Sequence, residues 1–511
     1  MSSYLFTLTI TPVQSFITQA RKTRDLFAGS EILSNIIRNT INRATKEYKA
    51  EIIFPQTEVV SNKFMAEFQN ISEENIRDIG KKLEKFIHEE FIKLIFEHTK
   101  CYDSSFDNFF QVFWVAVEST DDYQQSYKRL EQSLEAVKNL RVFEQKTQPK
   151  GKSKCVLCGE RNIAKTDKDD NLCLICYAKR CYLENEKNYP SLAKIALWDW
   201  LNNLDSKKKQ EFIIIFNKNE FDEELFFKDN LTEKYFKKIN INIKKLQKAK
   251  DTLNEIDTEE QKKYYALIQF DIDSLGKTLS DLDKKEQKRL SQLLAKFAKE
   301  SKKIVDKAGQ TVYAGGDDFL GFVNLNYLFD VIIDIQKAFE ETVKKEFNDL
   351  TYSTSIVIAH YKAPLHKVLD YSRELLAQTK NHFDDKNGVG IIVMSNSAIN
   401  AQTICRYDDL PLLKEMRDKK IGMNLHYKLN SVFNFLDRMS LDDYLTYKQM
   451  IKIEIKRLLK KEEKEFNQEI YDSLSSFFGN QNIKLSTNNY QIDFDNFIGY
   501  LKTLEQLKKV M

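Results

Sequence analysis

The sequence predicts an α+β fold that contains one antiparallel unit twice. Three observations predict it. The order strand, helix, two strands, helix, strand occurs in the first 144 residues and again within residues 264–359. Two C-x2-C cysteine pairs lie between the copies, and helical patterns follow the second copy. The repeated order matches the ferredoxin-like unit, in which two helices back an antiparallel sheet.

The first copy opens with a strand over residues 4–10, where the sequence alternates between two faces. Thr11-Pro12-Val13-Gln14 then fits an N-cap, a proline at the first helical position and a capping-box glutamine, and the helix is expected to run through residue 37. The remaining elements are expected in this order: strands near 52–54 and 63–68, a helix over 73–98, a strand over 110–117 and a helix from about 121.

The second copy has more sharply defined elements. They are a strand over 264–270, a helix over 284–305, a hairpin over 311–323, a helix over 327–347 and a strand over 354–359. The region after about residue 400 is expected to be helical throughout. Its clear amphipathic segments are 429–439, 444–459 and 465–478.

Four of the seven cysteines predict a zinc site. Cys155 and Cys158 form one C-x2-C pair, and Cys173 and Cys176 form another after fourteen intervening residues. This spacing is typical of tetrahedral Zn²⁺ sites, and four thiolates close the coordination sphere, so the ion is expected to be structural. The remaining cysteines are expected to be ordinary packed thiols: Cys101, Cys181 and Cys405.

The turn of the second copy's hairpin reads Gly-Gly-Asp-Asp at residues 315–318, and Asp271 and Asp273 close the strand before it. Glycines permit tight turn angles, and adjacent antiparallel strands would bring these acidic residues together. Crowded carboxylates raise one another's pKa unless cations lie between them, which predicts Mg²⁺ or Mn²⁺. Two such ions serve in-line displacement at phosphorus, so the pattern favours nucleotidyl transfer in a polymerase-type palm. The alternative is a solvent-exposed Gly-Asp turn.

Composition excludes several classes. The 511 residues are 30% charged and 42% hydrophobic, which is a globular balance. No apolar run approaches the roughly 20 residues of a membrane span, and no leader pattern occurs, so a cytoplasmic protein without membrane association is expected. The net charge of +3 requires any nucleic-acid contact to be local.

Several motifs resemble those of the large palm-domain subunit of type III-B (Cmr) CRISPR effector complexes. The stretch Ile-Thr-Pro-Val-Gln-Ser-Phe-Ile at 10–17, with Ala-Arg-Lys-Thr-Arg-Asp-Leu at 20–26 and Gly-Ser at 29–30, looks like the signature of that family's first palm. The four cysteines, Asp-Ile-Asp at 271–273 with Gly-Lys at 276–277, the Gly-Gly-Asp-Asp turn and Ile-Ala-His-Tyr-Lys-Ala-Pro-Leu at 358–365 continue it. The resemblance covers about residues 4–394.

This resemblance implies an RNA-activated nucleotidyltransferase that makes a second messenger, cyclic oligoadenylate, from ATP. It assigns catalysis and Mg²⁺ binding to Asp271, Asp317 and Asp318. Nucleotide contacts fall to these residues: Ser15, Arg21, Arg24, Ile272, Asp273, Ser274, Gly276, Lys277, Gly315, Gly316, Ser355, His360 and Lys380. The implied partners are other protein subunits of the complex, CRISPR RNA and target RNA.

The implied domains are a non-catalytic, nucleotide-binding palm at 1–144, a zinc-binding helical domain at 145–262, the catalytic palm at 263–400 and a C-terminal helical domain at 401–511. For some of these residues a plain structural role stays open. Asp273 is either a ligand or a surface residue, Lys380 either a triphosphate contact or a solvated lysine at a helix end, and His360 either a ribose contact or a structural histidine.

The chain also departs from the family pattern. No His-Asp dipeptide occurs and the palm signature begins almost at Met1, so the HD nuclease that many relatives carry is not expected. Ile272 and Ser355 stand where relatives often have glycine, which leaves the product open between cyclic oligoadenylate and AMP joined to S-adenosylmethionine. A diguanylate cyclase of the GGDEF type and an inactive scaffold subunit are the competing hypotheses.

Overall fold

The computed structural model describes most of the chain. The described residues are 2–56, 62–103, 106–107, 109–140, 153–167, 170–183, 189–217, 220–256, 261–395, 398–418, 425–433, 441–462, 468–480 and 490–510. The expected domain boundary at 144/145, residues 434–439 of one expected helix and 465–467 of another lie outside them. Among the described residues, no helix is both long and apolar enough to cross a bilayer.

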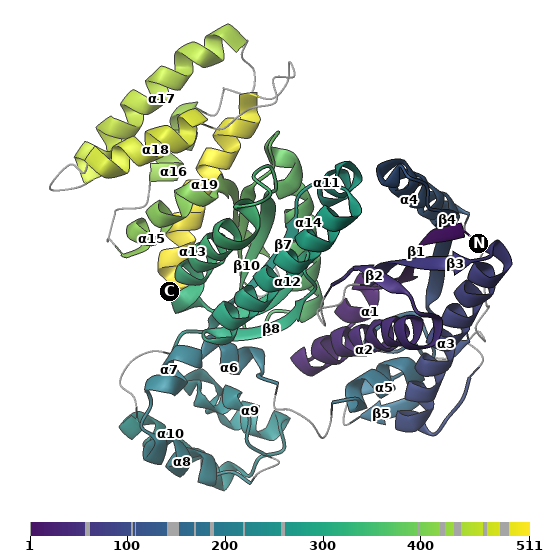
Figure 1. Ribbon diagram of the computed structural model, residues 1–511. Helices are drawn as coiled ribbons and strands as arrows, with labels where there is room; N and C mark the ends of the chain where they lie inside the picture. Colours follow the sequence, from purple (N-terminus) through teal and green to yellow (C-terminus); the bar gives the residue numbers. More distant parts are fainter. Residues whose placement is uncertain are drawn as a thin grey trace.

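The first sheet has four antiparallel strands in the order β2-β3-β1-β4. Its strands are β1 (Ser2–Thr11), β2 (Glu51–Phe54), β3 (Lys63–Ile71) and β4 (Gln111–Glu118). Its helices are α1 (Gln14–Thr18), α2 (Thr23–Tyr48), α3 (Glu73–Thr99) and α4 (Tyr123–Asn139). The expected strands are therefore present, and their order is that of a ferredoxin-like unit (Figure 1).

The expected continuous helix over residues 11–37 is wrong. Helix α1 starts only at Gln14, with the apolar Val13 at its N-cap, and it ends after five residues. The chain then re-enters a helix at Thr23 because the Asp25 carboxylate accepts hydrogen bonds from the backbone N–H groups of Arg21 and Lys22, at 3.1 and 3.0 Å. This local capping competes with helix continuation and separates α1 from α2.

The second sheet has six strands in the order β12-β11-β10-β7-β9-β8. They are β7 (Tyr264–Ile272), β8 (Gly309–Ala314), β9 (Asp318–Asn324), β10 (Tyr352–His360), β11 (Gly388–Met394) and β12 (Ile399–Arg406). Its helices are α11 (Leu275–Asp281), α12 (Lys284–Asp306), α13 (Leu328–Phe339), continued by a π-helical turn at Glu340–Lys344, and α14 (Leu365–His382). Strands β8, β9, β7 and β10 repeat the order of the first sheet.

The expectation of helices alone after residue 400 is wrong at its start. Strand β12 pairs with β11 as the antiparallel edge of the second sheet. Its Ala401, Thr403, Ile404 and Cys405 are buried, because the strand packs between β11 and α19. The helices that follow are α15 (Leu410–Asp418), α16 (Leu425–Phe433), α17 (Leu441–Glu462), α18 (Gln468–Asn480) and α19 (Tyr490–Val510).

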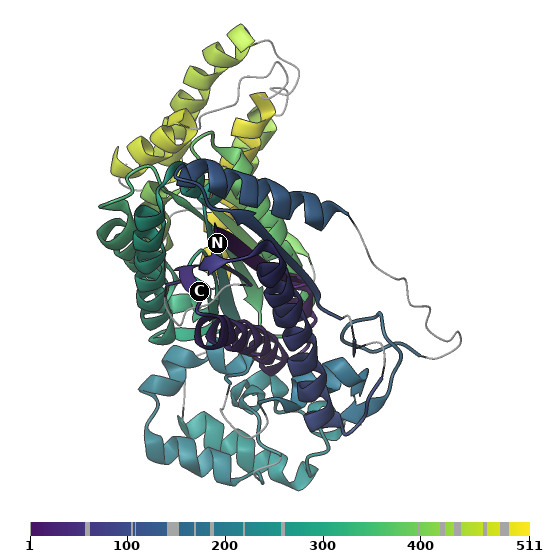
Figure 2. The same cartoon turned by 45° about the vertical axis from the view of Figure 1, so that its right-hand side comes forward.

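Short elements connect the two sheets. They are β5 (Lys165–Asp167), β6 (Asp170–Leu172), α5 (Leu174–Cys181), α6 (Leu192–Ala196), α7 (Trp198–Asn203), α8 (Ser206–Ile214), α9 (Glu233–Lys238) and α10 (Leu246–Ile256). Element α5 lies beside α2 and α3, whereas α6–α10 form a separate group next to β8 and α12 (Figures 1 and 2).

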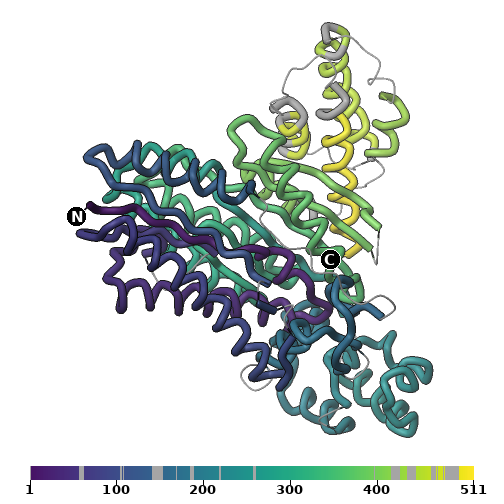
Figure 3. The backbone as a smooth tube through the Cα atoms, turned by 90° about the vertical axis from the view of Figure 1, so that its right-hand side faces the viewer, coloured from purple at the N-terminus to yellow at the C-terminus, as the bar shows by residue number. Residues whose placement is uncertain are grey.

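The second sheet is buried on both faces. Along β7, Tyr265 and Leu267 belong to one apolar core shared with α1, α2 and α3, while Ala266 and Ile268 belong to a second core shared with α12 and α19. The tube view shows the first sheet and its helices alongside the second sheet, with the C-terminal helices at the opposite side of the second sheet (Figure 3). The two sheets with their helices are therefore packed together, and the cavity described below lies between α1 and α2 on one side and the second sheet on the other.

Candidate active site

The turn between β8 and β9 depends on its two glycines. Gly316 has a φ of +92°, in the region that side chains rarely adopt. The Gly315 N–H donates to the Asp318 carbonyl at 2.8 Å and closes the turn. A Cβ on Gly315 would lie 2.2 Å from Oδ1 of Asp318. Gly316 thus permits the turn, and Gly315 leaves room for the carboxylate beside it.

The strand register brings the two acidic pairs together. Asp271 of β7 lies directly opposite Asp318 of β9, and opposed Cα atoms in antiparallel strands are about 4.5–5.5 Å apart. The Ile272 N–H donates to the Asp317 carbonyl at 2.9 Å, one residue further along. The end of β7 and the start of β9 therefore present their carboxylates at one edge of the second sheet.

The electrostatics of the turn suit a cation. Loss of solvation, and then the neighbouring Asp317 charge, raise the pKa of Asp318 to about 8. Burial also raises the pKa of Asp317, whose buried Oδ1 has no hydrogen-bond partner among the described residues. Buried carboxylate oxygens without donors are the hard oxygen ligands that Mg²⁺ and Mn²⁺ prefer, so these side chains fit a divalent ion.

A lysine already neutralises part of this cluster. Nζ of Lys380, in the last turn of α14, donates to Oδ1 of Asp271 and lies 3.9 Å from Oδ1 of Asp273. Burial, and then the neighbouring Lys386, lower the pKa of Lys380 to about 8. Lys380 is therefore a partly buried cation at the acidic edge, and it is not a solvated lysine at a helix end.

Asp273 is buried, which excludes the surface alternative. Only 3% of the residue is exposed. Its carboxylate accepts from the hydroxyls of Thr351 and Ser353 at 3.0 Å and from the Asn387 N–H at 3.2 Å. These hydrogen bonds connect the end of β7 to the start of β10 and to the loop before β11. The Asp273 carboxylate therefore has a structural role in holding these segments together.

The aspartates do not form a closed set of ligands. Among the described residues, the four cysteines are the single group of three or more potential ligands whose atoms all lie within 4.8 Å of one another. Cys158 Sγ and Cys173 Sγ are 3.9 Å apart, close to the roughly 3.8 Å that a tetrahedral ion with Zn–S bonds of about 2.3 Å requires, so the cysteines fit zinc.

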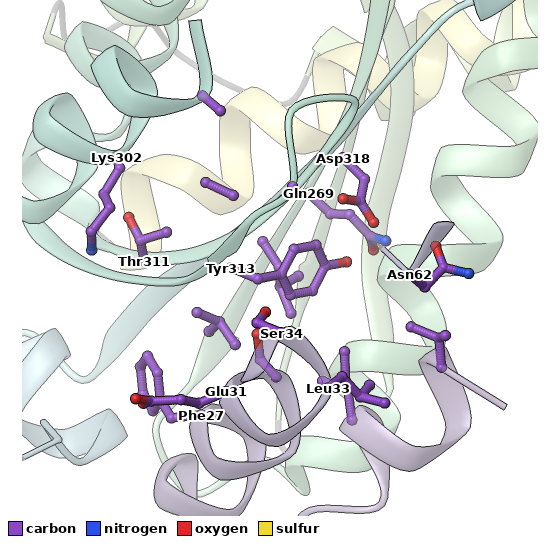
Figure 4. Close-up of a pocket in the computed structure, with 18 of the residues that line it drawn as sticks. Phe27, Glu31, Leu33, Ser34, Asn62, Gln269, Lys302, Thr311, Tyr313 and Asp318 are labelled. Carbon is purple, nitrogen blue, oxygen red and sulfur yellow. The ribbon is translucent and has the colours of Figure 1, made fainter. Parts of the chain in front are cut away.

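A cavity of about 860 Å³ opens beside the turn. This volume lies at the upper end of the roughly 300–1,000 Å³ typical of ligand pockets. Gly315 and Asp318 line it on one side, and residues of α1 and α2, including Gln14 and Ser34, line it on the other. In Figure 4 the Tyr313 ring projects into the space between Asp318 and the labelled residues of α2.

None of the predicted residues of the first copy, Ser15, Arg21 and Arg24, lines this cavity. Ser15 is exposed on α1, although its neighbours Gln14 and Ile17 line the cavity. Arg21 precedes α2 and forms an ion pair with Asp170 at 2.7 Å. Arg21 is therefore not on one helical face with Arg24, because the helix expected to carry both begins only at Thr23.

His360 lies away from the aspartates, whereas Ser355 pairs with the cavity residue Gln269, two residues along β7 from Asp271. On β10, His360 pairs with Tyr264, whereas Ser353 pairs with Asp271, so seven residues, or about 23 Å of strand, separate them. His360 Nδ1 accepts the Lys362 N–H at 3.1 Å, which fits the structural alternative. Ser355 is fully buried and bonds to Ser372, behind the cavity wall.

The remaining predicted contacts cluster at the start of α11. Ile272 is buried, whereas Ser274, Gly276 and Lys277 are exposed. Ser274 adopts a left-handed φ of 55° and accepts a hydrogen bond from Lys386 Nζ at 3.0 Å. A Cβ on Gly276 would meet nothing within 4 Å, so open space lies next to this turn.

Most cavity residues were not predicted from the sequence, and three of them lie close to the aspartates or to Lys380 in the chain or the sheet: Gln269, Tyr313 and Arg373. Arg373 stands seven residues before Lys380 on α14, and this helical spacing could have placed both on one face. Gln269 receives a hydrogen bond from Ser372 at 2.9 Å. Burial, and then the Asp318 charge, hold the pKa of Tyr313 well above its ordinary value, so its hydroxyl stays protonated.

Comparisons with known proteins match both halves of this arrangement. Residues 264–390 match the model of the Cas10/Cmr2 second palm domain, and residues 5–139 match that of the N-terminal region of the CRISPR-associated protein Cmr2. Together these ranges cover just over half of the chain. The chain belongs to the Cas10/Cmr2 family.

Relatives of known structure or description support this placement. The Cmr2 subunit of the Pyrococcus furiosus CRISPR system is 24% identical, with 94% of this Cas10/Cmr2 chain and 73% of the relative covered. A type III-B Cmr-beta structure in the apo state matches with a TM-score of 0.68 at 14% identity, covering 99% of this chain and 82% of the other. A Csm1-Csm4 cassette in complex with cA4 matches with a TM-score of 0.50 at 13% identity, covering 99% and 70%. At these identities the structures establish a shared fold.

Proposed function

We propose that this Cas10/Cmr2 chain is an RNA-activated nucleotidyltransferase of a type III-B CRISPR antiviral effector complex, and that it makes a second messenger from ATP. One observation carries the proposal. Asp271 and Asp318 lie directly opposite each other, with Asp317 next in the chain, where Gly315 and Asp318 of the turn line the cavity. A cavity of this size has room for one nucleotide and an acceptor.

The proposed step is a displacement at phosphorus. A hydroxyl oxygen of the acceptor, the 3′-hydroxyl where a second nucleotide is the acceptor, bonds to the α-phosphorus of ATP. The bond from that phosphorus to the oxygen bridging to the β-phosphate breaks, the hydroxyl proton is lost, and pyrophosphate leaves. Mg²⁺ or Mn²⁺ held by Asp271, Asp317 and Asp318 would neutralise phosphate charge and lower the pKa of the hydroxyl.

The residues of the chain have separable roles in this step. Asp317 and Asp318 hold the negative charge that binds the cations, and Lys380, which neutralises Asp271 in the absence of ligand, becomes a point charge for the triphosphate. Residues of α1 and α2 enclose the acceptor side of the cavity. Asp273 positions the end of β7 through its bonds to Thr351 and Ser353.

The partners follow from the family and its solved relatives. One matching structure is a type III-B Cmr-beta complex bound to cognate target RNA, with a TM-score of 0.67, 14% identity and coverage of 100% of this chain and 83% of the other. We infer that this chain assembles with other Cmr subunits, CRISPR RNA and target RNA. Target RNA would shift the two palms toward the active arrangement, so that the unliganded complex is nearly silent.

The decisive experiment uses the assembled complex with ATP and Mg²⁺, with and without target RNA, and identifies products by mass spectrometry. Asp317→Ala combined with Asp318→Ala should abolish the product while assembly and RNA binding persist. The matched control is Asp334→Ala, an exposed aspartate on α13 that should leave turnover unchanged. Turnover that survives the double substitution would refute the catalytic assignment, and equal turnover without target RNA would refute activation.

Two further arms of the same assay, with S-adenosylmethionine added and with GTP, separate the competing products. Cyclic oligoadenylate is expected from ATP alone, and an AMP adduct appears only when S-adenosylmethionine is added and accepted. A preference for GTP would favour the diguanylate cyclase hypothesis. No nucleotide product under any of these conditions would favour the inactive scaffold.

A further inference from the structure

Helix α1 and the break that follows it form a part of the cavity wall whose position depends on contacts with other elements. Val13, Gln14, Ile17 and Thr18 of α1 line the cavity, and α2 contributes residues from Phe27 onward. A five-residue helix has no stability of its own, and its last carbonyl groups lack partners within the helix. The position of α1 therefore depends on contacts made by other elements.

Lys179 of α5 supplies these contacts. Only 2% of the residue is exposed, and its ammonium group donates to the carbonyls of Phe16 and Gln19, both at 2.6 Å, and lies 3.4 Å from the carbonyl of Ile17. A cation on the last carbonyls of a helix also opposes the partial negative charge of that end. Gly29 makes room for this arrangement, because a Cβ there would lie 3.1 Å from Ile17 Cα and 3.4 Å from Lys179 Cδ.

The next residue, Arg180, holds the start of α2. The residue is fully buried, and its guanidinium donates to both carboxylate oxygens of Asp25, with 2.9 Å for the Nη2–Oδ2 contact. Asp25 is the residue whose carboxylate caps the break at Arg21 and Lys22. Arg180 Nη1 also donates to Asp167 at 2.8 Å and Asp170 at 3.1 Å, so one guanidinium joins the β5–β6 hairpin to α2.

The charges of this cluster are matched. Three carboxylates, Asp25, Asp167 and Asp170, meet Arg180 together with Arg21 and Lys22 from the break, with ion pairs of 2.7 Å for Arg21–Asp170 and 3.9 Å for Lys22–Asp167. A buried ionic network contributes little net stability compared with apolar packing, but it specifies one geometry. The network is therefore suited to positioning the break.

Helix α5 connects the network to the cysteine cluster. Cys173 is its N-cap, and Cys176 lies three residues before Lys179 and four before Arg180. An ion bound by Cys155, Cys158, Cys173 and Cys176 would fix the start of α5 and with it the direction of both basic side chains. The cluster, α5, the α1–α2 break and the cavity wall thus form a continuous chain of contacts.

We propose that Lys179 and Arg180 are positioning residues through which the cysteine cluster sets the acceptor side of the nucleotide cavity. This inference rests on the proposed nucleotidyltransferase function. It assigns the cysteine-bearing element a role in nucleotide affinity, whereas the three aspartates are responsible for the chemistry.

The test uses Lys179→Met in the full chain, because methionine keeps the length and packing of the side chain and removes its donors. The matched control is Lys207→Met, an exposed lysine on α8. The variant should keep its bound zinc, exchange the amide hydrogens of residues 14–22 faster than wild type, and bind a non-hydrolysable ATP analogue with Mg²⁺ about tenfold more weakly. In the complex, KM for ATP should rise about tenfold while kcat at saturation stays within about twofold.

The readouts separate the possible failures. Unchanged exchange at 14–22, or a fall in kcat at constant KM, in a zinc-loaded variant would overturn the inference. Arg180→Lys, which keeps the charge and loses the forked contact to Asp25, is the second variant and should reproduce the weaker binding. Loss of zinc or of folding in both variants would also overturn it, because the residues would then be general supports. If wild type binds no ATP analogue, the proposed function fails, and hydrogen exchange alone still decides the positioning role.

Discussion

At the scale of single residues, the acidic edge combines groups whose pKa values are displaced toward neutrality. Loss of solvation, and then the Asp317 charge, raise the pKa of Asp318 to about 8. Burial, and then the Lys386 charge, lower the pKa of Lys380 to about 8. A carboxylate and an ammonium that both titrate near neutral pH are typical of functional sites. Without a metal ion, Asp318 is therefore protonated at neutral pH, and a divalent cation that binds its carboxylate must displace that proton.

This displacement predicts a pH dependence of metal binding. The metal-free folded chain protonates Asp318 below about pH 8, whereas the unfolded chain releases that proton near pH 4. The stabilisation from this group is therefore complete below about pH 4 and is lost as pH rises through 8. Mg²⁺ should bind up to about 50-fold more weakly at pH 6 than at pH 8, because Asp318 is about 1% ionised at pH 6 and about half ionised at pH 8. The affinities are measured by Mg²⁺ titration of thermal unfolding. Asp318→Asn should reduce the difference and leave the part that is due to Asp317, whose pKa burial also raises. Equal Mg²⁺ midpoints at both pH values in wild type would contradict the prediction.

At the scale of elements, two glycines of the β8–β9 hairpin allow the position of the Asp318 carboxylate to be tested separately from the stability of the hairpin. Gly315→Ala would place a Cβ 2.2 Å from the Asp318 carboxylate, which can rotate away, so the substitution should move the catalytic group with little effect on folding. Turnover should fall about 10–100-fold, while the free energy of unfolding changes by less than about 1 kcal/mol.

The matched control lies in the same hairpin. Gly321→Ala would contact the apolar side chains of Phe319 and Val305 at 3.0–3.2 Å. It should therefore lower the melting temperature and leave kcat per folded molecule nearly unchanged. The two substitutions are compared by thermal unfolding and by product formation in the complex. The same pattern of losses in both variants would show that Gly315 has no special relation to Asp318.

The elements also show what sequence patterns can and cannot predict. The alternation along β1 and the glycines of the hairpin act over a few residues, so the strands and the turn were predictable. The α1–α2 break was not, because the Asp25 carboxylate that caps it locally also forms a buried ion pair with Arg180, 155 residues away, which no local pattern reveals. The same long-range pair explains why Arg21 was wrongly placed on one helical face with Arg24. Strand β12 was missed because its pairing partner β11 had not been recognised as a strand.

At the scale of the whole molecule, the cavity exists because the two sheets are held against each other. Helix α12 of the second sheet packs on the first sheet, where Lys284 Nζ donates to Glu51 at 2.6 Å and to Glu67 at 2.5 Å. Lys288 also contacts Glu51. Glu51 and Glu67 are directly opposed on β2 and β3. Lys284 of α12 therefore lies between two like charges and reduces their repulsion.

Removal of this lysine should loosen the contact between the sheets. Lys284→Met leaves Glu67, which is largely buried, beside Glu51 without its cation, and should lower the free energy of unfolding by about 1–2 kcal/mol. Addition of Glu67→Gln should restore about half of that loss, because the repulsion disappears with the charge.

Lys303→Met, which breaks an exposed pair with Glu300, is the control and should cost less than about 0.5 kcal/mol. Urea unfolding of wild type, Lys284→Met, Glu67→Gln and the double variant gives the coupling energy between Lys284 and Glu67. A coupling near zero would mean that this ion pair does not hold α12 against the first sheet.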